Sequence, residues 1–354
     1  MNLSIGIVGL PNVGKSTLFE IITKKQVDRE NYPFCTIEPN VGVVAVPDIR
    51  VDKLAHLNQS EKKIYTTVEF VDIAGLVKGA SKGEGLGNQF LAQIRETDEI
   101  VCVLRCFQND KIVNTLDQID PLLEKEILET ELILKDLETV NKRLTSLEKE
   151  IKTGKKSMME EERILAKAQD LLQQGQILFE QEWEEEEKKV LETYQLLTLK
   201  PRLYLLNGQE SEVPAHILET FNKNNWPYLI MDVAMELETI DLSESDRIDL
   251  GLSPQSEINT LIQSTYKLLD LITFFTIESN QTRAWILLKG LKAPDAGGVI
   301  HTDFQEKFIK AEIINWEKLL EAGSWSLARQ KGWLQLEGKD YVVQDGDVIV
   351  FKHG

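Results

Sequence analysis

Short apolar runs separated by glycine-containing loops fill the first third of the chain. Four of them cover residues 3–8, 41–46, 66–71 and 100–107. Runs of this length are typical of strands that are buried on both faces of a parallel sheet. Helical patterns lie between them, so the alternation predicts βαβ units and an α/β domain.

The pattern becomes helical and strongly charged between about residues 122 and 197. Acidic residues outnumber basic ones by nineteen to twelve between Glu124 and Glu192. Apolar residues recur at alternating steps of four and three, which is a heptad seam, and residues 153–154 interrupt it. We expect an antiparallel coiled-coil hairpin; a helical subdomain packed flat on the first domain is the alternative. The apolar positions are Ile133, Leu137, Val140, Leu144, Leu147 and Ile151, then Ile164, Leu165, Ala168, Leu171, Leu172 and Leu178.

Strand-like runs return at residues 201–207 and 228–231, so we expect the first domain to resume there and to carry the hairpin as an insertion. From about residue 271, short runs alternate with turns, as in a small α+β domain. The expected strands there are residues 272–277, 284–288, 341–343 and 348–351, with one helix around residues 305–311. The predicted domains are residues 1–120 with 199–270, residues 121–198, and residues 271–354.

A phosphate-loop pattern of Gly, four free positions and Gly-Lys-Ser follows the first expected strand and opens the first expected helix. This context places backbone N–H groups and the positive end of a helix dipole around a phosphate. Lys15 would reach the outer phosphates and act in catalysis, and the Ser16 hydroxyl would ligate Mg²⁺. A glycine-rich turn without a ligand is the alternative. The predicted nucleotide-binding residues here are Gly9, Pro11, Asn12, Val13, Gly14, Lys15, Ser16 and Thr17.

A second motif, Asp72-Ile73-Ala74-Gly75, follows the strand that ends at Val71. An acid at the end of a strand can hold Mg²⁺ through water, and the Gly75 N–H can donate to the γ-phosphate in catalysis. The loop that contains Thr36 offers a hydroxyl, which we predict to be the second protein ligand of Mg²⁺. The position of Asp72, fifty-seven residues after Lys15, makes an otherwise common motif informative.

Composition limits the remaining classes of protein. The net charge of −18 argues against nonspecific coating of nucleic acid, and no apolar run approaches the eighteen or more residues of a membrane span. Three cysteines favour a reducing, cytoplasmic setting over a disulfide framework. Cys35 adjoins Thr36, so an adduct there would disturb closure over Mg²⁺, and redox control is a hypothesis; a small apolar loop residue is the alternative.

The two long motifs and the C-terminal region resemble the YchF (Obg-like) ATPases, and the likeness covers essentially the whole chain. The matching segments are residues 9–17, 31–40 and 72–80, and in the TGS-like region residues 283–285, 300–304, 337–341 and 344–347. The resemblance implies a cytosolic, Mg²⁺-dependent nucleotide hydrolase that associates with the ribosome, with the large subunit as the expected partner. It also implies activation by K⁺, because Asn12 resembles a loop asparagine that coordinates K⁺ in some relatives. The lysines of the TGS region that could contact ribosomal RNA are Lys289, Lys292, Lys307 and Lys310; a solvated surface is the alternative.

Base choice rests on the segment that begins at Asn207. A guanine-specific relative would carry Asn-Lys-x-Asp, whereas Gly208 and Glu210 occupy the second and fourth positions here. Asn207 can still hydrogen-bond a purine edge, so we expect ATP to be preferred and GTP to bind more weakly. Leu76 stands where Ras-like switches carry the glutamine that orients water, so intrinsic hydrolysis should be slow.

The sequence therefore predicts a doubly wound P-loop domain with an inserted helical hairpin and a C-terminal TGS domain of the β-grasp type. Its predicted function is slow ATP hydrolysis as a switch at the ribosome. Two alternatives remain: a GTPase, and a ribosome-binding module in which the nucleotide is mainly a structural ligand.

Overall fold

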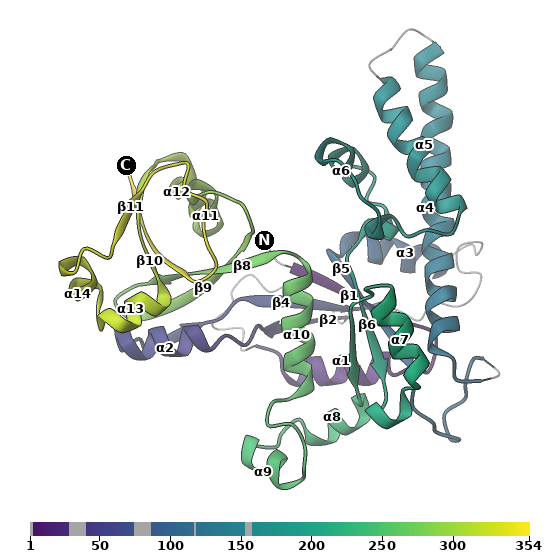
Figure 1. The fold of residues 1–354 in the computed structure, drawn as a ribbon, viewed down its shortest axis with the longest axis horizontal. Coiled ribbons are helices and arrows are strands. Elements are labelled where there is room, and N and C mark those ends of the chain that lie inside the picture. The colour runs from purple at the N-terminus through teal and green to yellow at the C-terminus, as the bar shows by residue number, and fades with distance from the viewer. Residues whose placement is uncertain (1–2, 28–39, 74–85, 117, 153–157) are drawn as a thin grey trace.

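The structure is a computed structural model of the 354-residue chain (Figure 1). It describes residues 3–27, 40–73, 86–116, 118–152 and 158–354, and of residues 86–90 only the backbone. None of the helices in these ranges combines the length and apolar character needed to cross a bilayer.

The first sheet has six strands in the order β2-β4-β1-β5-β6-β7. All neighbouring pairs are parallel except β2 with β4, which is antiparallel. Every residue of β5 and β6 is buried, as the continuous apolar runs predict for strands covered on both faces. The strands are β1 (Leu3–Val8), β2 (Val41–Ala45), β4 (Thr67–Asp72), β5 (Glu99–Arg105), β6 (Arg202–Asn207) and β7 (Tyr228–Met231).

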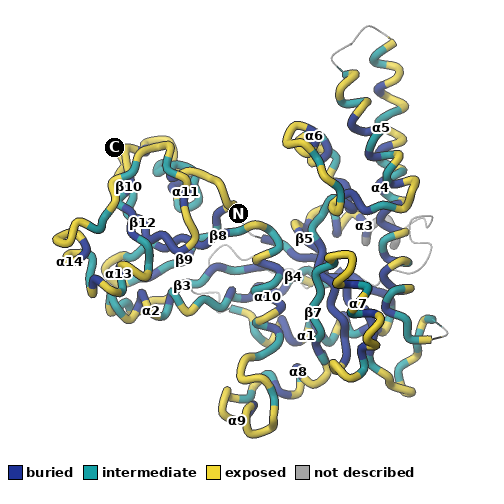
Figure 2. Tube along the Cα trace, viewed as in Figure 1, coloured by how far each residue is buried: buried dark blue, intermediate teal, exposed yellow. Residues whose placement is uncertain are grey.

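Helices lie on both faces of this sheet and bury one large apolar core against it (Figures 1 and 2). They are α1 (Lys15–Lys24), α3 (Leu86–Glu96), α7 (Ala215–Lys223), α8 (Val233–Thr239) and α10 (Glu257–Leu268). The short helix α9 (Glu244–Asp249) joins the last two. The arrangement confirms the predicted doubly wound α/β fold with a mostly parallel sheet.

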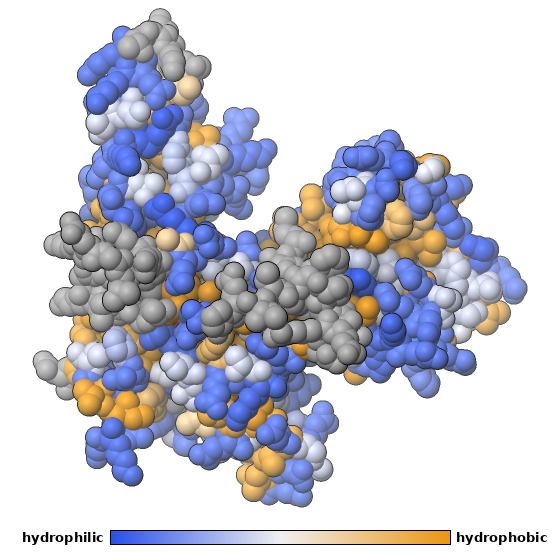
Figure 3. Space-filling view, turned by 180° about the vertical axis from the view of Figure 1, so that it is seen from behind, coloured by the Kyte–Doolittle hydropathy of each residue, from blue (hydrophilic) through white to orange (hydrophobic). Residues whose placement is uncertain are grey.

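A helical hairpin projects from this domain (Figure 1). It consists of α4 (Pro121–Lys152), α5 (Met159–Gln173) and, near its base, α6 (Glu185–Glu192). Alternate members of the predicted seam, Val140 and Leu147, are fully buried, whereas Leu137 and Leu144 are only partly buried. Hydrophilic residues cover most of the outer part of the hairpin (Figure 3), so its stability depends on this narrow internal seam.

The base of the hairpin is more than a pair of helices. Two 3-10 turns, Leu178–Glu180 and Leu197–Leu199, return the chain across it and add apolar side chains to the same cluster. Asp136 of α4 is fully buried and accepts hydrogen bonds from the N–H groups of Leu197 and Thr198 at 2.9 and 2.7 Å. The polar contacts thus fix the turn Leu197–Leu199, which leads into β6 and which we call the strap.

The second sheet also has six strands, in the order β11-β10-β12-β8-β9-β3. The strands are β3 (Lys62–Ile64), β8 (Leu271–Ile277), β9 (Gln281–Leu288), β10 (Phe308–Asn315), β11 (Gln335–Glu337) and β12 (Asp347–His353). One apolar cluster includes residues of α11 (Ala293–Ile300), and another includes residues of α13 (Trp316–Ala322) and α14 (Trp325–Gln330).

One edge of the second sheet comes from far upstream in the chain. β3 pairs in parallel with β9, and α2 (Ile49–Asn58) buries Val51 and Leu54 in the same cluster as α13. These residues lie within the 1–120 segment that the sequence assigns to the first domain. Residues 49–64 therefore leave the first domain and pack in the second sheet and its core; we call them the crossover arm.

Two local predictions in the C-terminal region are wrong. The expected helix at residues 305–311 is split: α12 (Thr302–Glu306) ends early, and the rest begins β10. Ala311 and Ile313 are buried in one apolar cluster and Ile314 in the other. Neighbouring side chains thus point to opposite faces, as they do in a strand. Residues 341–343 form no strand; Val342 makes only an isolated bridge with Lys292.

Candidate functional site

The glycine loop connects the carboxyl end of β1 to the first turn of α1, as the sequence predicts. Gly14 precedes α1 with φ +106°, and a Cβ there would collide with the Asn207 amide. At Gly9 a Cβ would lie 2.6 Å from the carbonyl oxygen of Val103. Both glycines are therefore required for the close approach of the loop to β5 and β6.

Lys15 is held inside the loop. Its side chain is 8% exposed, and Nζ donates a hydrogen bond to the Leu10 carbonyl oxygen at 2.7 Å. Burial lowers the pKa of Lys15 to about 8, against the opposing charges of Asp72 and Glu124. Ser16 in the same first turn of α1 is exposed, so its hydroxyl is available to a ligand.

Asn207 joins three loops at the end of β6. Its Nδ2 donates to the Val13 carbonyl oxygen at 2.8 Å, and its Oδ1 accepts from the Val233 N–H at 3.1 Å. Its backbone oxygen accepts from the N–H groups of Cys106 and Phe107 at 2.8 and 3.0 Å. Asn207 is 4% exposed, so the structure gives it a bracing position in addition to the base-reading role that the sequence predicts.

A cavity of about 630 Å³ lies elsewhere, but the cavity beside the glycine loop, of about 560 Å³, is the one that contains the predicted residues. Lys15, Ser16, Thr17 and Asn12 line it from the loop, and Asn207 lines it from β6. Glu210 is exposed and does not line it; Gln209 and Glu212 do. Gly9, Pro11, Val13 and Gly208 shape the surrounding backbone without lining the cavity. Its full lining is Asn12, Gly14, Lys15, Ser16, Thr17, Phe107, Gln108, Asn109, Ile112, Asn207, Gln209, Glu212, Asp232, Val233 and Ala234.

The lining residues that the sequence analysis missed are the segment from Phe107 to Ile112, which follows β5, and Asp232, which follows β7. The signal that could have found them is positional, because ligands of open α/β sheets bind beyond the carboxyl ends of the parallel strands. The side chain of Glu236, in contrast, is buried away from the cavity and pairs with Arg247 at 3.2 Å.

The residues present fit a magnesium-bound triphosphate. The Ser16 hydroxyl lies in the first turn of α1, and the Asp72 carboxylate ends β4. Burial raises the pKa of Asp72, and the nearby charge of Lys15 opposes this shift. Mg²⁺ commonly takes one or two protein ligands together with phosphate oxygens. The other predicted residues, Cys35, Thr36 and Gly75, lie outside the described residues.

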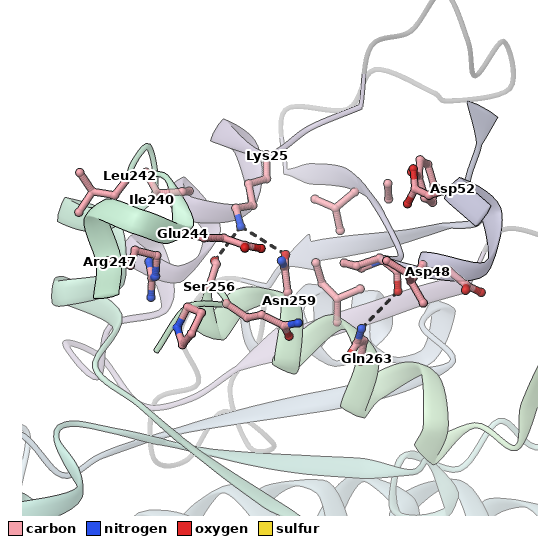
Figure 4. Close-up of a pocket in the computed structure, with 18 residues that line it drawn as sticks. Lys25, Asp48, Asp52, Ile240, Leu242, Glu244, Arg247, Ser256, Asn259 and Gln263 are labelled. Carbon is pink, nitrogen blue, oxygen red and sulfur yellow. Dashed lines mark hydrogen bonds between the residues drawn. The ribbon is translucent and has the colours of Figure 1, made fainter. Parts of the chain in front are cut away.

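The larger cavity lies at the opposite end of α1, between β2, α2 and α10 (Figure 4). There Lys25 Nζ donates to Ser256 Oγ at 2.7 Å and to Asn259 Oδ1 at 3.3 Å, and Gln263 donates to the Pro47 carbonyl oxygen. It contains none of the glycine-loop residues, so it is separate from the candidate nucleotide site.

A glycine loop between the first strand of a parallel sheet and the helix that follows it, with a buried lysine and an adjacent cavity, defines a P-loop nucleotide-binding protein. Sequence profiles agree: the one described as a 50S ribosome-binding GTPase matches residues 4–136, and the YchF-type GTPase C-terminal profile, described as a protein of unknown function (DUF933), matches residues 271–354. The protein named ribosome-binding ATPase YchF from Bacillus subtilis is 44% identical over 99% of both chains, and the one from Haemophilus influenzae is 43% identical over 99% of both. The chain belongs to the YchF family.

A solved structure supports the same assignment over the whole fold. The YchF GTPase of Schizosaccharomyces pombe is 34% identical, covers 99% of this chain and 98% of its own, and superposes with a TM-score of 0.87. The match therefore includes the hairpin and the C-terminal sheet as well as the nucleotide domain.

Proposed function

We propose that this protein is a slow, Mg²⁺-dependent ATPase that acts as a switch on the large ribosomal subunit. The observation that carries the proposal is the cavity beside the glycine loop, where Lys15, Ser16 and Asn207 converge from α1 and β6. The relatives from B. subtilis and H. influenzae carry ribosome-binding ATPase in their names, which supports the same activity and partner here.

The chain's own residues would divide the work on the triphosphate. The N–H groups of the loop and the first turn of α1 would bind phosphate oxygens, and Lys15 would neutralise charge between the outer phosphates. Ser16, Thr36 and, through water, Asp72 would hold Mg²⁺, and Gly75 would donate its N–H to the γ-phosphate. Mg²⁺ would supply charge neutralisation across those phosphates.

The proposal favours ATP because the lysine of the guanine clamp would fit poorly at Gly208. Gly208 has φ +157°, and a Cβ there would lie 3.0 Å from the Phe107 nitrogen. A lysine at this position would therefore be strained and would crowd the backbone at Phe107. Gln209, Glu212 and Asp232 border the cavity instead, so acceptors are available for the N6 amino group of adenine.

A proposal about K⁺ follows from the loop. Asn12 has φ +64°, and its Nδ2 donates to the Val113 carbonyl oxygen at 3.1 Å, which leaves Oδ1 as the amide atom for a cation. Activation by K⁺ over Na⁺ is therefore part of the proposal. Replacing KCl by NaCl at constant ionic strength tests it, since equal turnover in the two salts would remove K⁺ from the mechanism.

The Lys15→Ala variant tests the hydrolase. We expect ATP turnover to fall at least about 100-fold because charge on the outer phosphates is no longer compensated. Lys24→Ala is the matched control, since Lys24 lies on the same helix, is exposed and pairs at the surface with Glu20 at 3.7 Å. Turnover of Lys15→Ala equal to that of the control, with both variants folded, would remove this site as the catalytic one.

The ribosomal part is tested with purified subunits. The candidate contacts are the hairpin and the exposed lysines Lys289 and Lys310; Lys292 and Lys307 already pair with Asp340 and Asp303 at 2.8 and 2.9 Å. We expect large subunits, and not small ones, to bind the full-length protein and accelerate ATP turnover. Binding to neither subunit would overturn the ribosomal part of the proposal, whereas binding without faster turnover would favour the ribosome-binding module in which the nucleotide is mainly a structural ligand.

A further inference from the structure

Arg105 is the last residue of β5, and the segment that follows it wraps around its side chain. Its side chain is 2% exposed, and the guanidinium is surrounded by the residues that follow it. Nε donates to the Phe107 carbonyl oxygen at 3.3 Å, and the two terminal nitrogens donate to the Asn109 and Ile112 carbonyl oxygens at 3.2 Å. The guanidinium also stacks 4.4 Å from the centre of the Phe107 ring. One planar cation thus fixes residues 107–112, which we call the wall segment.

The wall segment forms part of the lining of the nucleotide cavity. Four of its residues line the cavity, and the next residue, Val113, accepts the hydrogen bond from Asn12 of the glycine loop. The four are Phe107, Gln108, Asn109 and Ile112. Because β5 lies between β1 and β6 in the sheet, the wall segment lies between the glycine loop and the segment after Asn207, where the sequence predicts base recognition.

Arg105 is tied in turn to the hairpin. Its backbone N–H donates at 2.8 Å to Oε2 of Glu124, which lies in the first turn of α4. Glu124 is fully buried, and its Oε1 has no hydrogen-bond partner among the residues that the structure describes. A buried carboxylate is costly unless nearby positive groups and N–H donors compensate it, and Arg105 supplies both.

We propose that Arg105 is a positioning residue for recognition of the nucleoside part of the ligand, and that Glu124 is the link through which α4 holds Arg105 in place. The inference rests on the proposed nucleotide-binding function and deepens it. By the reciprocity of linked equilibria, occupation of the base side of the cavity and the seating of α4 then influence each other.

Two probes separate this role from general damage: ATP, and inorganic tripolyphosphate, which has no base or sugar. Arg105→Met is expected to raise the dissociation constant of ATP at least about tenfold and that of tripolyphosphate less than about threefold. Arg105→Lys is expected to restore little, because one ammonium group cannot reach three carbonyl oxygens in fixed directions. The Michaelis constant should rise with the dissociation constant, while kcat at saturating ATP stays within about threefold.

A double-mutant cycle tests the link to α4. Glu124→Ala should weaken ATP binding in the same direction, and the combination with Arg105→Met should weaken it by less than the product of the two single effects. Arg329→Met is the control, since Arg329 pairs with Glu312 on the second sheet. Independent, multiplicative effects would overturn the role of Glu124.

The proposal about Arg105 fails if folded Arg105→Met or Arg105→Lys protein binds ATP normally, or loses ATP and tripolyphosphate affinity equally. Failure of the proposed function itself looks different, because the wild-type protein would then bind neither probe. If Arg105→Met does not fold, Arg105→Lys carries the same comparison.

Discussion

Asn207 illustrates how far a single residue can be interpreted from sequence. Its position after a strand predicts a place at the nucleotide, and the structure puts it on the cavity wall. Its amide, however, already bonds Val13 and Val233, which lie far from it in the chain. The local motif predicts that Asn207 lies at the nucleotide. Its hydrogen bonds depend on which loops meet beyond the end of the sheet, and no local pattern specifies that.

The glycine loop was predictable for the opposite reason. Its strand, turn and helix are contiguous, so spacing alone places Lys15 and Ser16 at the first turn of α1. Glu212 replaces Glu210 on the cavity because residues 210–212 form a 3-10 turn in which Glu212 accepts from the Gln209 N–H at 2.9 Å. A sequence pattern does not specify which residue of such a short turn faces the cavity.

Glu124 should make stability depend on pH. Burial raises its pKa from 4.5 to about 7, so its contribution to the free energy of unfolding is fully present below pH 4.5 and is lost as the pH rises through 7. Glu124→Gln keeps an acceptor for the Arg105 N–H and removes this loss. We expect the variant to gain stability relative to the wild type between pH 5 and pH 8, by up to about 3 kcal/mol.

Urea unfolding at several pH values measures this gain. Glu126→Gln is the matched control, because Glu126 lies on the same helix and is exposed. Parallel pH profiles for wild type and Glu124→Gln would show that Glu124 does not titrate as its burial requires.

The burial of Cys102 and Cys106 limits the redox hypothesis to Cys35. Cys102 and Cys106 are 2% and 3% exposed, and burial raises the pKa of each thiol to about 12. Since the thiolate is the reactive form, neither should react with iodoacetamide in native protein at pH 8. We expect a native Cys35→Ser variant to remain unmodified by mass spectrometry and to take up two adducts after denaturation. Native labelling of Cys102 or Cys106 would contradict this and would remove the basis for assigning oxidant sensitivity to Cys35.

At the scale of elements, the hairpin depends on a polar anchor at its base. Asp136 accepts three hydrogen bonds, from the Leu197 N–H and from the N–H and hydroxyl of Thr198. Asp136→Ala would leave these buried donors unpaired, so we expect a loss of about 3 kcal/mol in the free energy of unfolding. Glu126→Ala, on the exposed face of α4, should cost less than about 0.5 kcal/mol. Equal losses in denaturant titrations of the two variants would show that the strap is not held by Asp136.

The heptad pattern predicted α4 and α5 well because helix periodicity is local and extends over many turns. The segment from residue 305 to 311 was misassigned because it is short and mixes charged with apolar residues, a composition that suits either structure. Its neighbours decide the outcome: β11 and β12 flank β10 and supply its hydrogen bonds, and both come later in the chain.

At the scale of the whole molecule, the crossover arm makes the two sheets interdependent. Asn58 and Glu61 bond to Glu278 and Asn280, and Arg50 pairs with Asp345 at 2.6 Å, in addition to the pairing of β3 with β9. No sequence pattern predicts such a link, since β3 has three residues and its partner follows more than two hundred residues later.

Hydrogen exchange should show that the crossover arm unfolds with the second sheet. Peptides from residues 49–64 are expected to gain and lose protection together with residues 271–288, rather than with β1 and β4, because their hydrogen bonds and apolar contacts lie in the second sheet. The measurement is native-state exchange by mass spectrometry over a denaturant series. Arm peptides that opened together with β1 would contradict the prediction.

The crossover arm also imposes a delay during synthesis. Glu61 leaves the ribosome 219 residues before its partner Asn280, and at about 5–20 residues per second that is a wait of roughly 10–40 s. Throughout that interval Val51 and Leu54 have no second-sheet core to enter, and β3 has an unpaired edge, the kind of surface that pairs wrongly with other chains. The arm therefore waits without its partners until residues 271–354, which supply the rest of the second sheet, have emerged.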